Sequence, residues 1–478
     1  MKNLKKIFVI VLCAFIVVQI ISPAASAYSN REISAEPAQK SASSGKTVEK
    51  DFTSTDNIGD SFEIKDDEYK KYDPIMGEIP EQRSMYEKHF RHRDGTYTAA
   101  LYSSPVHYRA ENGEWKDIDN RLILKNEKPD SAGQPAYTPT ASSADIRLPT
   151  GFANGNKMTI GKNGHTVKIG LDSAADNYNS AAENAVIENS QYKSPQRISN
   201  TEVFSLSDEE IKAYNDEIMS SDCGSSKATY PNAFNSADLV YEVTSTSVKE
   251  SIVVNETLSS YTFVFDMDLD GLIPVQGKDG SVQLFENTDD DEPCFIIESP
   301  YMFDNDGAES SDVSLTLIDD KLTISANSEW ISDESRAFPV TIDPTITFNQ
   351  YSIRDTYVSS VNPDTNYVSG SALYAGKTQT GLFRTYMKIT LPELPEGSVI
   401  YDASLDLTQT GITYANTNKW IYVFDLFLNN SWDISTITWN TQPVSADANG
   451  PLNAGTKQVD YLHYVNSSDP VLFSFNIT

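Results

Sequence analysis

Cysteine and histidine are scarce in this chain, which contains three cysteines and five histidines among 478 residues. Cys13 lies in the N-terminal apolar run, so the rest of the chain contains two cysteines, Cys223 and Cys294. These two could form a disulfide, but their surroundings do not resemble a disulfide-rich scaffold, and no thiolate metal site has the required spacing. The sequence also lacks H-E-x-x-H, C-x-x-C, G-x-S-x-G and a phosphate-binding glycine loop. The enzyme classes that these motifs mark are therefore not indicated.

Basic residues are also few. The chain has 37 lysines and arginines against 68 aspartates and glutamates, which gives a net charge of −31 at pH 7. Because phosphate binding needs a basic surface, this balance argues against nucleic acid as a partner. Residues 345–478 contain eleven acidic and six basic residues, so most of the acidic excess lies upstream. The simplest interpretation is a solvated acidic surface that keeps the protein soluble.

Long apolar runs are missing except at the N-terminus. Lysines precede the run Ile7 to Ile21, and the small residues Ala25-Ser26-Ala27 follow it. This order predicts a secretory signal peptide, residues 1–27, cleaved after Ala27. An uncleaved membrane anchor is the less favoured alternative, because the run has about 15 residues and a span needs about 20. We therefore expect a secreted, extracellular protein with no membrane span after cleavage. Association with the cell wall is one location that this allows.

The rest of the chain divides by composition. Residues 28–84 are rich in Ser, Lys, Glu, Asp and Thr and poor in large apolar groups, which predicts a disordered spacer. Residues 85–344 show short alternating apolar runs, which are typical of β-strands. One helix is expected among them, because a capping box at Ser207 precedes an apolar stripe with helical spacing. We interpret it as a surface insertion into a β-rich, sandwich-like domain.

Residues 345–478 have the clearest strand pattern. Tyr386 to Leu391 and Ala403 to Leu407 alternate apolar and polar side chains, and Trp420 to Leu428 is apolar on both faces. Such short runs between turn residues predict an antiparallel, jelly-roll-like β-sandwich, so the whole protein is expected to be mainly β. The sequence ends directly after the expected strand Val471 to Ile477. We therefore expect this sandwich to be truncated, without its closing strand.

Several segments of this region carry a family resemblance. In order, they read DTYV, NPDTNY, LYAG, RTYMKI, LPELPEGSVI and TITWNTQP. They resemble a DNRLRE-type module, also called carbohydrate-binding module family 96, which occurs on secreted bacterial proteins. The motif D-N-R-L-R-E, after which the module is called, is not visible in this region. The resemblance therefore depends on the strand pattern. It implies a β-sandwich over about residues 345–478 that binds polysaccharide without chemistry of its own.

A second resemblance covers roughly residues 80–345. The segments DGTYTAALYSSPVHY, GEWKDIDN, ADLVYEVTSTSVKESIV and AFPVTIDPTI resemble the leader region that precedes the repeat array in Rhs/YD-repeat, wall-associated surface proteins. In that family this region leads directly into DNRLRE-type modules, so the two resemblances support each other. Together they imply the N-terminal part of a longer surface protein.

Candidate ligand-binding residues follow from the implied carbohydrate function. Sugar binding needs an exposed, flat aromatic ring with polar groups nearby, and an arginine could meet a uronate carboxylate. Core packing explains the same aromatic residues equally well, so both interpretations stay open. The candidates are Tyr357, Trp420, Trp432, Trp439 and Arg384, with Tyr367 and Tyr374 comparable to them.

A calcium site is the one metal interpretation that the sequence offers. Asp266, Asp268 and Asp270 begin like the loop of an EF-hand. However, Gly277 stands where the loop needs its last acidic ligand, and the segment alternates like a half-buried strand. A solvated strand face is therefore the stronger interpretation of these aspartates. No other cofactor is expected.

These features favour a non-catalytic secreted or cell-surface protein with cell-wall or extracellular polysaccharide as its partner. The alternative is a polysaccharide-degrading enzyme, a lyase or hydrolase, with catalytic residues in residues 85–345 and the module as a targeting arm. In that region the polar and aromatic residues expected of a catalytic cleft are scattered, which favours the first hypothesis. A third hypothesis makes the chain the delivery segment of a polymorphic toxin.

Overall fold

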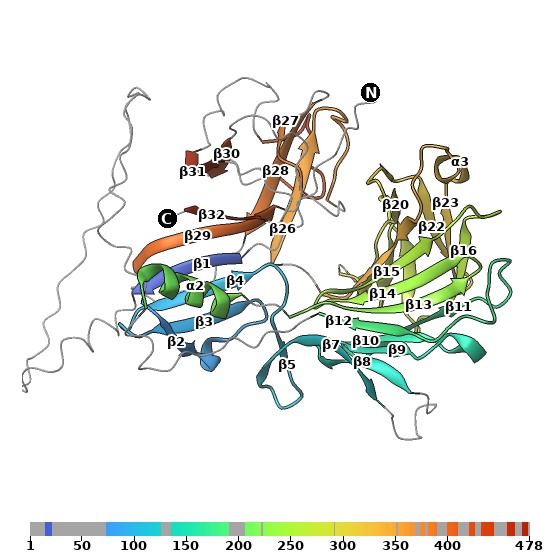
Figure 1. Cartoon of the computed structure of the whole chain (residues 1–478), viewed down its shortest axis with the longest axis horizontal. Coiled ribbons are helices and arrows are strands. Elements are labelled where there is room, and N and C mark those ends of the chain that lie inside the picture. The colour runs from blue at the N-terminus through green and yellow to red at the C-terminus, as the bar shows by residue number, and fades with distance from the viewer. Residues whose placement is uncertain are drawn as a thin grey trace, which may run out of the picture.

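The computed structural model is mainly β, as the alternating runs predict. It describes residues 15–21, 73–125, 135–190, 206–220, 223–290, 292–349, 352–368, 373–377, 381–389, 399–409, 420–425, 432–443, 457–463 and 471–476. Within this part of the chain, no helix is long and apolar enough to cross a membrane. Two large antiparallel sheets form the sandwich on the right of Figure 1.

The two sheets of the sandwich are built from strands between residues 119 and 347. The eight-stranded sheet has the order β22 (Val313–Ile318), β23 (Lys321–Ala326), β16 (Thr262–Asp268), β11 (His165–Leu171), β10 (Met158–Lys162), β9 (Asp145–Pro149), β8 (Ala136–Ala141) and β7 (Asp119–Lys125). The second sheet has the strand order β12 (Val186–Asn189), β13 (Ser226–Phe234), β14 (Ala237–Val243), β15 (Ser247–Val254), β25 (Thr345–Thr347), β19 (Phe295–Ile297), β18 (Val282–Phe285) and β17 (Ile273–Gln276). Beside this path lie β20 (Tyr301–Asp304), β21 (Glu309–Ser310) and β24 (Val340–Asp343).

One apolar core fills the space between these sheets. Both β14 and β16 alternate between more and less buried residues along their length, so each strand turns one face inward. Phe234 of one sheet contacts Phe263 of the other, with ring centroids 5.0 Å apart. Full burial of such a side chain contributes about 1.5–3 kcal/mol. The short helices α3 (Ser328–Ile331) and η2 (Ala153–Gly155) lie at the ends of strands.

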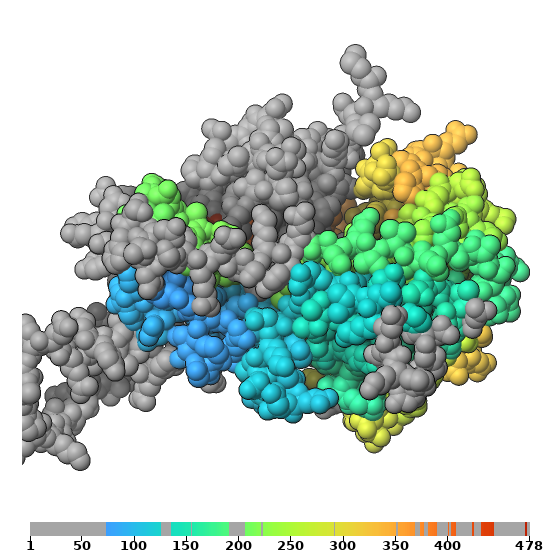
Figure 2. All heavy atoms as spheres, turned by 60° about the horizontal axis from the view of Figure 1, so that its bottom comes forward, coloured from blue at the N-terminus to red at the C-terminus, as the bar shows by residue number. Residues whose placement is uncertain are grey.

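A smaller sheet and helix α2 (Asp208–Met219) lie beside the sandwich (Figure 1). The sheet has the order β2 (Ile75–Glu78), β3 (Glu87–His92), β4 (Tyr97–Tyr102), β1 (Phe15–Ile21), β29 (Val399–Gln409) and β32 (Val471–Asn476). The hairpin of β5 (His107–Arg109) and β6 (Trp115–Asp117) follows β4. Figure 2 shows residues 73–125, coloured blue to cyan, at the surface next to the green strands of the sandwich.

Helix α2 begins at the predicted capping box, where the Ser207 hydroxyl accepts from the Glu210 N–H and the Glu210 carboxylate accepts from the Ser207 N–H. The helix lies at the surface, as expected, and its buried face packs against the smaller sheet. Asn215 is buried and its Oδ1 accepts the N–H of Ile75 at 2.9 Å. Tyr102 donates its hydroxyl to the Met219 carbonyl at 2.6 Å. Ile211 and Tyr214 of the predicted apolar stripe are buried, whereas the buried Asn215 beside them was not indicated by the stripe.

Strand β1 comes from the apolar run of the predicted signal peptide. Its backbone pairs with β4 on one side and with β29 on the other. Cleavage after Ala27 would take this strand out of the sheet. The signal peptide therefore stays a prediction.

The C-terminal region forms the smaller sheets in the upper part of Figure 1. A three-stranded sheet has the order β26 (Ile353–Ser359), β28 (Leu382–Ile389) and β27 (Gly376–Lys377). Strands β30 (Trp420–Asp425) and β31 (Lys457–His463) form a separate antiparallel pair. The short strands confirm the expected fold class, and β29 and β32 connect this region to the smaller sheet.

The expected end of the spacer at residue 84 and the expected end of the β-rich domain at residue 344 both differ from the structure. Residues 73–84, which composition assigned to the spacer, contain β2 and the short helix η1 (Pro80–Gln82), and Ile75 is only 1% exposed. Strand β25 pairs with β15 and β19, so the sandwich continues past residue 344. The remainder of the expected spacer, residues 28–72, lies outside the described residues. Cys223 and Cys294 do not form the disulfide that the sequence allowed.

One carboxyl group is buried within the sandwich. Glu250 of β15 is 1% exposed and lies directly opposite Tyr241 in the register of β14 and β15. Burial raises the pKa of Glu250 to about 8; the charge of Asp343 adds to this effect and the polar hydroxyl of Tyr241 opposes it. The carboxyl therefore stays largely protonated in the folded protein at neutral pH, whereas it ionises in the unfolded chain.

This difference predicts how stability depends on pH. Between the unfolded pKa of 4.5 and the folded value of about 8, the folded state holds a proton that the unfolded state has lost, so stability falls as pH rises. Glu250→Gln removes this titration. We expect the variant to match the wild type near pH 4.5 and to be more stable at pH 9 by about a few kcal/mol, because a tenfold change in proton affinity corresponds to about 1.4 kcal/mol.

Chemical denaturation at several pH values measures the effect. Glu242→Gln is the matched control, because Glu242 lies on β14 one residue from Tyr241 and is half-buried. An equal gain in stability by Glu250→Gln at pH 4.5 and at pH 9 would contradict the assignment of a raised pKa.

Candidate functional site

The sheet formed by β26, β28 and β27 has two chemically different faces. Successive side chains of a strand point to opposite faces, so Tyr357 lies on one face and Val358 on the other. The register places Tyr357 opposite Thr385 and Val358 opposite Arg384. Val358 is fully buried, whereas Tyr357 is only partly buried. One face therefore packs inside the module and the other carries aromatic rings near its surface.

The partly buried face carries a group of four aromatic side chains. Tyr357 stacks on Tyr367 with ring centroids 4.2 Å apart and an angle of 19° between the rings. Tyr374 meets Tyr357 edge to face at 4.8 Å, and Phe383 lies 6.0 Å from Tyr374. All four are partly exposed. We call Tyr357, Tyr367, Tyr374 and Phe383 the tyrosine cluster.

Loop hydrogen bonds hold the tyrosine cluster together. The side-chain amide of Asn366 donates to the carbonyl groups of Ile434 and Ile437 at 3.0 and 2.6 Å, which fixes the loop that carries Tyr367. The hydroxyl of Thr385 donates to the carbonyl of Tyr374 at 3.1 Å. These contacts orient the rings before any ligand arrives, so less conformational entropy is lost on binding.

Two carboxyl groups, those of Glu309 and Asp355, lie near the tyrosine cluster. Burial raises the pKa of Tyr357 and of Tyr374, and the carboxylate of Glu309 on β21 contributes to both shifts. Burial also raises the pKa of Asp355, which precedes the cluster on β26, to about 6. Tyr357 and Tyr374 therefore stay neutral hydrogen-bond donors at physiological pH, with two carboxylates nearby. Aromatic rings, hydroxyl donors and acceptors together suit a sugar ring without negative charge.

The opposite face is occupied by packing within the module. Trp439 is 6% exposed and forms a small core with Val358 and Tyr386. Arg384 lies 5.0 Å above the Trp439 ring and donates to Gln442 Oε1 at 2.8 Å. The Tyr386 hydroxyl donates to the same oxygen at 3.0 Å. A cation held over a core tryptophan stabilises the fold, and it is not free to bind a uronate.

The five sequence candidates thus separate. Tyr357 belongs to the tyrosine cluster, whereas Trp439 and Arg384 belong to the opposite face. Trp432 is also there, partly buried, with its ring 5.5 Å from Tyr386. Trp420 begins β30, and its side chain lies outside the described residues. Sequence reasoning missed Phe383, whose place in β28 directly before Arg384 assigns it to the face of Tyr357.

The aspartates considered for calcium are paired with lysines. Asp266 lies 2.7 Å from Lys157 Nζ, and Asp268 lies 2.7 Å from Lys168 Nζ. Hydrogen bonds with these lysines lower the pKa of both carboxyls, although burial opposes the effect. Asp270 lies in the turn after β16 with a positive φ of 51°. The structure therefore agrees with the solvated strand face rather than with a calcium loop.

Comparison with known proteins bears on the same region. Residues 346–468 match carbohydrate-binding module family 96. This match confirms the carbohydrate-binding module that the sequence pattern predicted, over about the same residues.

Curated relatives match a larger part of the chain at low identity. The "tRNA nuclease WapA" of Bacillus subtilis strain 168 is 25% identical over 393 residues, which cover 77% of this chain and 15% of the relative. The "tRNA3(Ser)-specific nuclease WapA" of Bacillus spizizenii matches with the same identity and coverage. The chain thus spans about 15% of the length of the curated relatives that it matches. No solved structure matches the chain.

The two faces of the module predict different effects of mutation. Trp439→Ala should create a cavity in the module core and destabilise the module by about 3–5 kcal/mol, as is typical for buried aromatic residues. Tyr367→Ala should cost about 1 kcal/mol or less, because the ring is partly exposed and contributes mainly one stacked pair.

Thermal unfolding of the full chain, followed by tryptophan fluorescence, measures both effects. Tyr367→Phe is the control, since it keeps the stacked ring and removes only the hydroxyl that accepts from Asn362. A larger loss for Tyr367→Ala than for Trp439→Ala would show that the core has been assigned to the wrong face.

Proposed function

We propose that this chain is a non-catalytic secreted or cell-surface protein whose module binds a neutral polysaccharide. The observation that carries the proposal is the match of residues 346–468 to carbohydrate-binding module family 96, together with the tyrosine cluster on the partly exposed face of that module. The polysaccharide belongs to the cell wall or the extracellular matrix. The module acts by holding the protein to it.

The chemistry of the tyrosine cluster supports a neutral sugar as ligand. A sugar presents C–H groups on one face and hydroxyls at its edge, which match an aromatic ring and the polar groups beside it. The carboxylates of Asp355 and Glu309 can accept hydroxyl hydrogens, and they repel uronates and phosphates. Arg384, the cation that could have met a uronate, is engaged by Trp439 and Gln442 on the other face.

Export is part of the proposal and is supported by the N-terminal sequence. Lysines, the apolar run and Ala25-Ser26-Ala27 have the order of a signal peptide. A carbohydrate-binding module is also useful outside the cell, where polysaccharide is found.

We further propose that the chain corresponds to the N-terminal part of a longer wall-associated protein of the Rhs type. The support is the low-identity match to long curated proteins, of which the chain covers 15%, and the leader-like segments upstream of the module. The nuclease activity in the names of these relatives belongs to those proteins. The net charge of −31 disfavours phosphate binding by this segment, so its part is display or delivery.

Pull-down of the full chain with insoluble polysaccharides tests the binding. We expect retention on at least one neutral polysaccharide, and less or none on alginate and pectin. Tyr374→Ala should weaken retention about fivefold, which corresponds to roughly 1 kcal/mol from one stacking ring. Lys388→Gln, on the opposite face of the same strand pair, should bind like the wild type. Retention that is unchanged by Tyr374→Ala and Tyr357→Ala would remove the tyrosine cluster from the binding site.

The proposal also predicts that no turnover accompanies binding. After prolonged incubation with the polysaccharides that it retains, the chain should release neither reducing ends nor unsaturated products. Product release that disappears when a single acidic residue or tyrosine in residues 85–345 is replaced would establish the alternative, a polysaccharide-degrading enzyme with the module as its targeting arm.

A further inference from the structure

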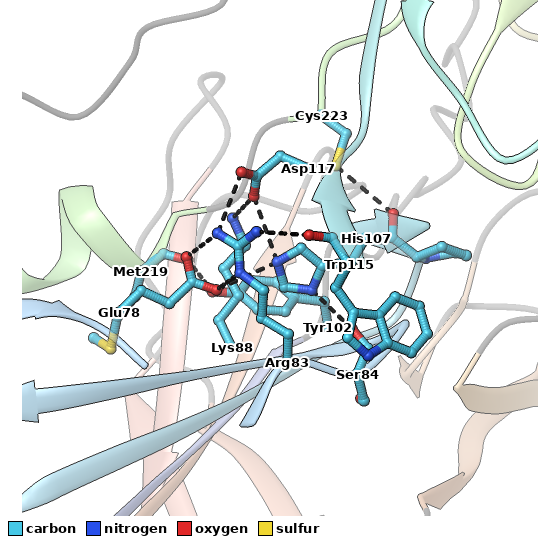
Figure 3. A network of polar contacts seen from close by, with 11 residues as sticks. Glu78, Arg83, Ser84, Lys88, Tyr102, His107, Trp115, Asp117, Met219 and Cys223 are labelled. Atoms are coloured by element: carbon cyan, nitrogen blue, oxygen red, sulfur yellow. Dashed lines mark hydrogen bonds and ion pairs between the residues drawn. The ribbon is translucent and has the colours of Figure 1, made fainter. Parts of the chain in front are cut away.

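Three potential metal ligands converge beside the smaller sheet. Glu78 ends β2, His107 begins β5 and Asp117 ends β6. The register of the β5–β6 hairpin places His107 directly opposite Asp117. One ligand atom of each residue lies within 4.8 Å of the other two, and this is the only such group among the described residues. Figure 3 shows the imidazole beside both carboxylates, with the Arg83 guanidinium between Glu78 and Asp117.

The hydrogen bonding of His107 makes the arrangement unusual. The side chain is fully buried, and Nδ1 lies 2.7 Å from the carbonyl oxygen of Ser84. A carbonyl only accepts, so Nδ1 carries a proton, and Nε2 is the nitrogen that can present a lone pair to a metal ion when the ring is neutral. Nε2 lies 3.3 Å from Glu78 Oε1 and 3.4 Å from Asp117 Oδ1. Arg83 Nε and Lys88 Nζ donate to these two oxygens, but His107 Nε2 has no hydrogen-bond partner, and a metal ion between the three atoms would satisfy it.

The distances favour a metal ion over a proton. Charge-assisted N–H···O bonds are about 2.7–2.9 Å long, and His107 Nε2 makes no hydrogen bond despite its burial. By contrast, two ligands bound to zinc at about 2.0–2.1 Å in a tetrahedron are about 3.3–3.4 Å apart. Both Nε2–carboxylate separations agree with that value. The bond from Nδ1 to a backbone carbonyl is the contact by which proteins orient a metal-binding histidine.

We propose that Glu78, His107 and Asp117 form a binding site for a zinc-like divalent transition-metal ion. One imidazole nitrogen and two carboxylates suit zinc, cobalt or manganese, whereas calcium prefers oxygen ligands alone. The side chain of Asp117 is 49% exposed, which leaves an entry path and room for water as fourth ligand. The ion joins β2 to the β5–β6 hairpin, where only a small apolar cluster, which includes Ile75, Tyr102 and Val106, supplies a core.

Two basic residues orient the carboxylates and limit the affinity. Arg83 donates Nε to Glu78 Oε1 at 2.7 Å and Nη2 to Oε2 at 2.6 Å. Lys88 Nζ lies 3.2 Å from Asp117 Oδ1, the oxygen that faces His107. The bound ion therefore shares Glu78 Oε1 with Arg83 and competes with Lys88 for Asp117 Oδ1, so Lys88 must move aside. Removal of its charge should strengthen metal binding.

Metal binding by the full chain, without a histidine tag and after treatment with EDTA, tests the proposal. Equilibrium dialysis against zinc should give one ion per chain, and cobalt should give the intense visible absorption of tetrahedral coordination. Asp117→Asn and Glu78→Gln should each weaken zinc binding roughly tenfold or more, a loss at least as large as that from an outer-shell contact. Lys88→Gln should strengthen it. Zinc should also raise the melting temperature of the wild type, and of Asp117→Asn much less.

His165→Gln is the matched control, because His165 also lies near a carboxylate, Glu286 at 3.4 Å, but has no second one. It should bind zinc like the wild type. Asp117 is half exposed, so its variant remains folded and informative even where a His107 variant does not. The proposal is overturned if the folded wild type binds no stoichiometric zinc, cobalt or manganese, since a proton then bridges the three groups. It is equally overturned if Asp117→Asn and Glu78→Gln bind zinc as tightly as the wild type.

Discussion

Each strand of this protein must bury one face, and strand register decides which residues that face contains. In β14 the inward positions Leu239, Tyr241 and Val243 are fully buried, and the side chains between them are half-buried. A shift by one residue would exchange these two sets and expose the core. The same constraint acts on β26, where Val358 points inward and Tyr357 outward. Core and candidate binding surface are therefore set by a single choice of register.

Local patterns predicted the elements of the structure well, because alternation and capping are local properties. Ser207 and Glu210 form the predicted capping box, and the short strands occur where apolar residues alternate. The packing of those elements was harder to predict. Asn215 bonds to the backbone of Ile75, which is 140 residues away in sequence. No periodicity within α2 distinguishes such a buried asparagine from a solvated one.

The two candidate sites were predictable to different degrees for the same reason. Tyr357, Tyr367 and Tyr374 are aromatic residues in a region that resembles a carbohydrate-binding module, so they could be named from the sequence. Their separation from Trp439 depends on which face each side chain occupies, and that follows only from the pairing of β26 with β28. His107, Glu78 and Asp117 carry no sequence motif, because three elements supply one ligand each. Only the fold brings them together.

The residues that identify the module are mostly those that hold it together. In the segment TITWNTQP, Trp439 packs in the core and Gln442 accepts hydrogen bonds from Arg384 and Tyr386. The Gln442 side chain also donates to the Trp439 carbonyl at 2.6 Å. This network must be satisfied wherever the segment folds, because unpaired polar groups beside a buried tryptophan are costly. A match in this segment therefore reports the fold, whereas the choice of sugar depends on the tyrosine cluster on the other face.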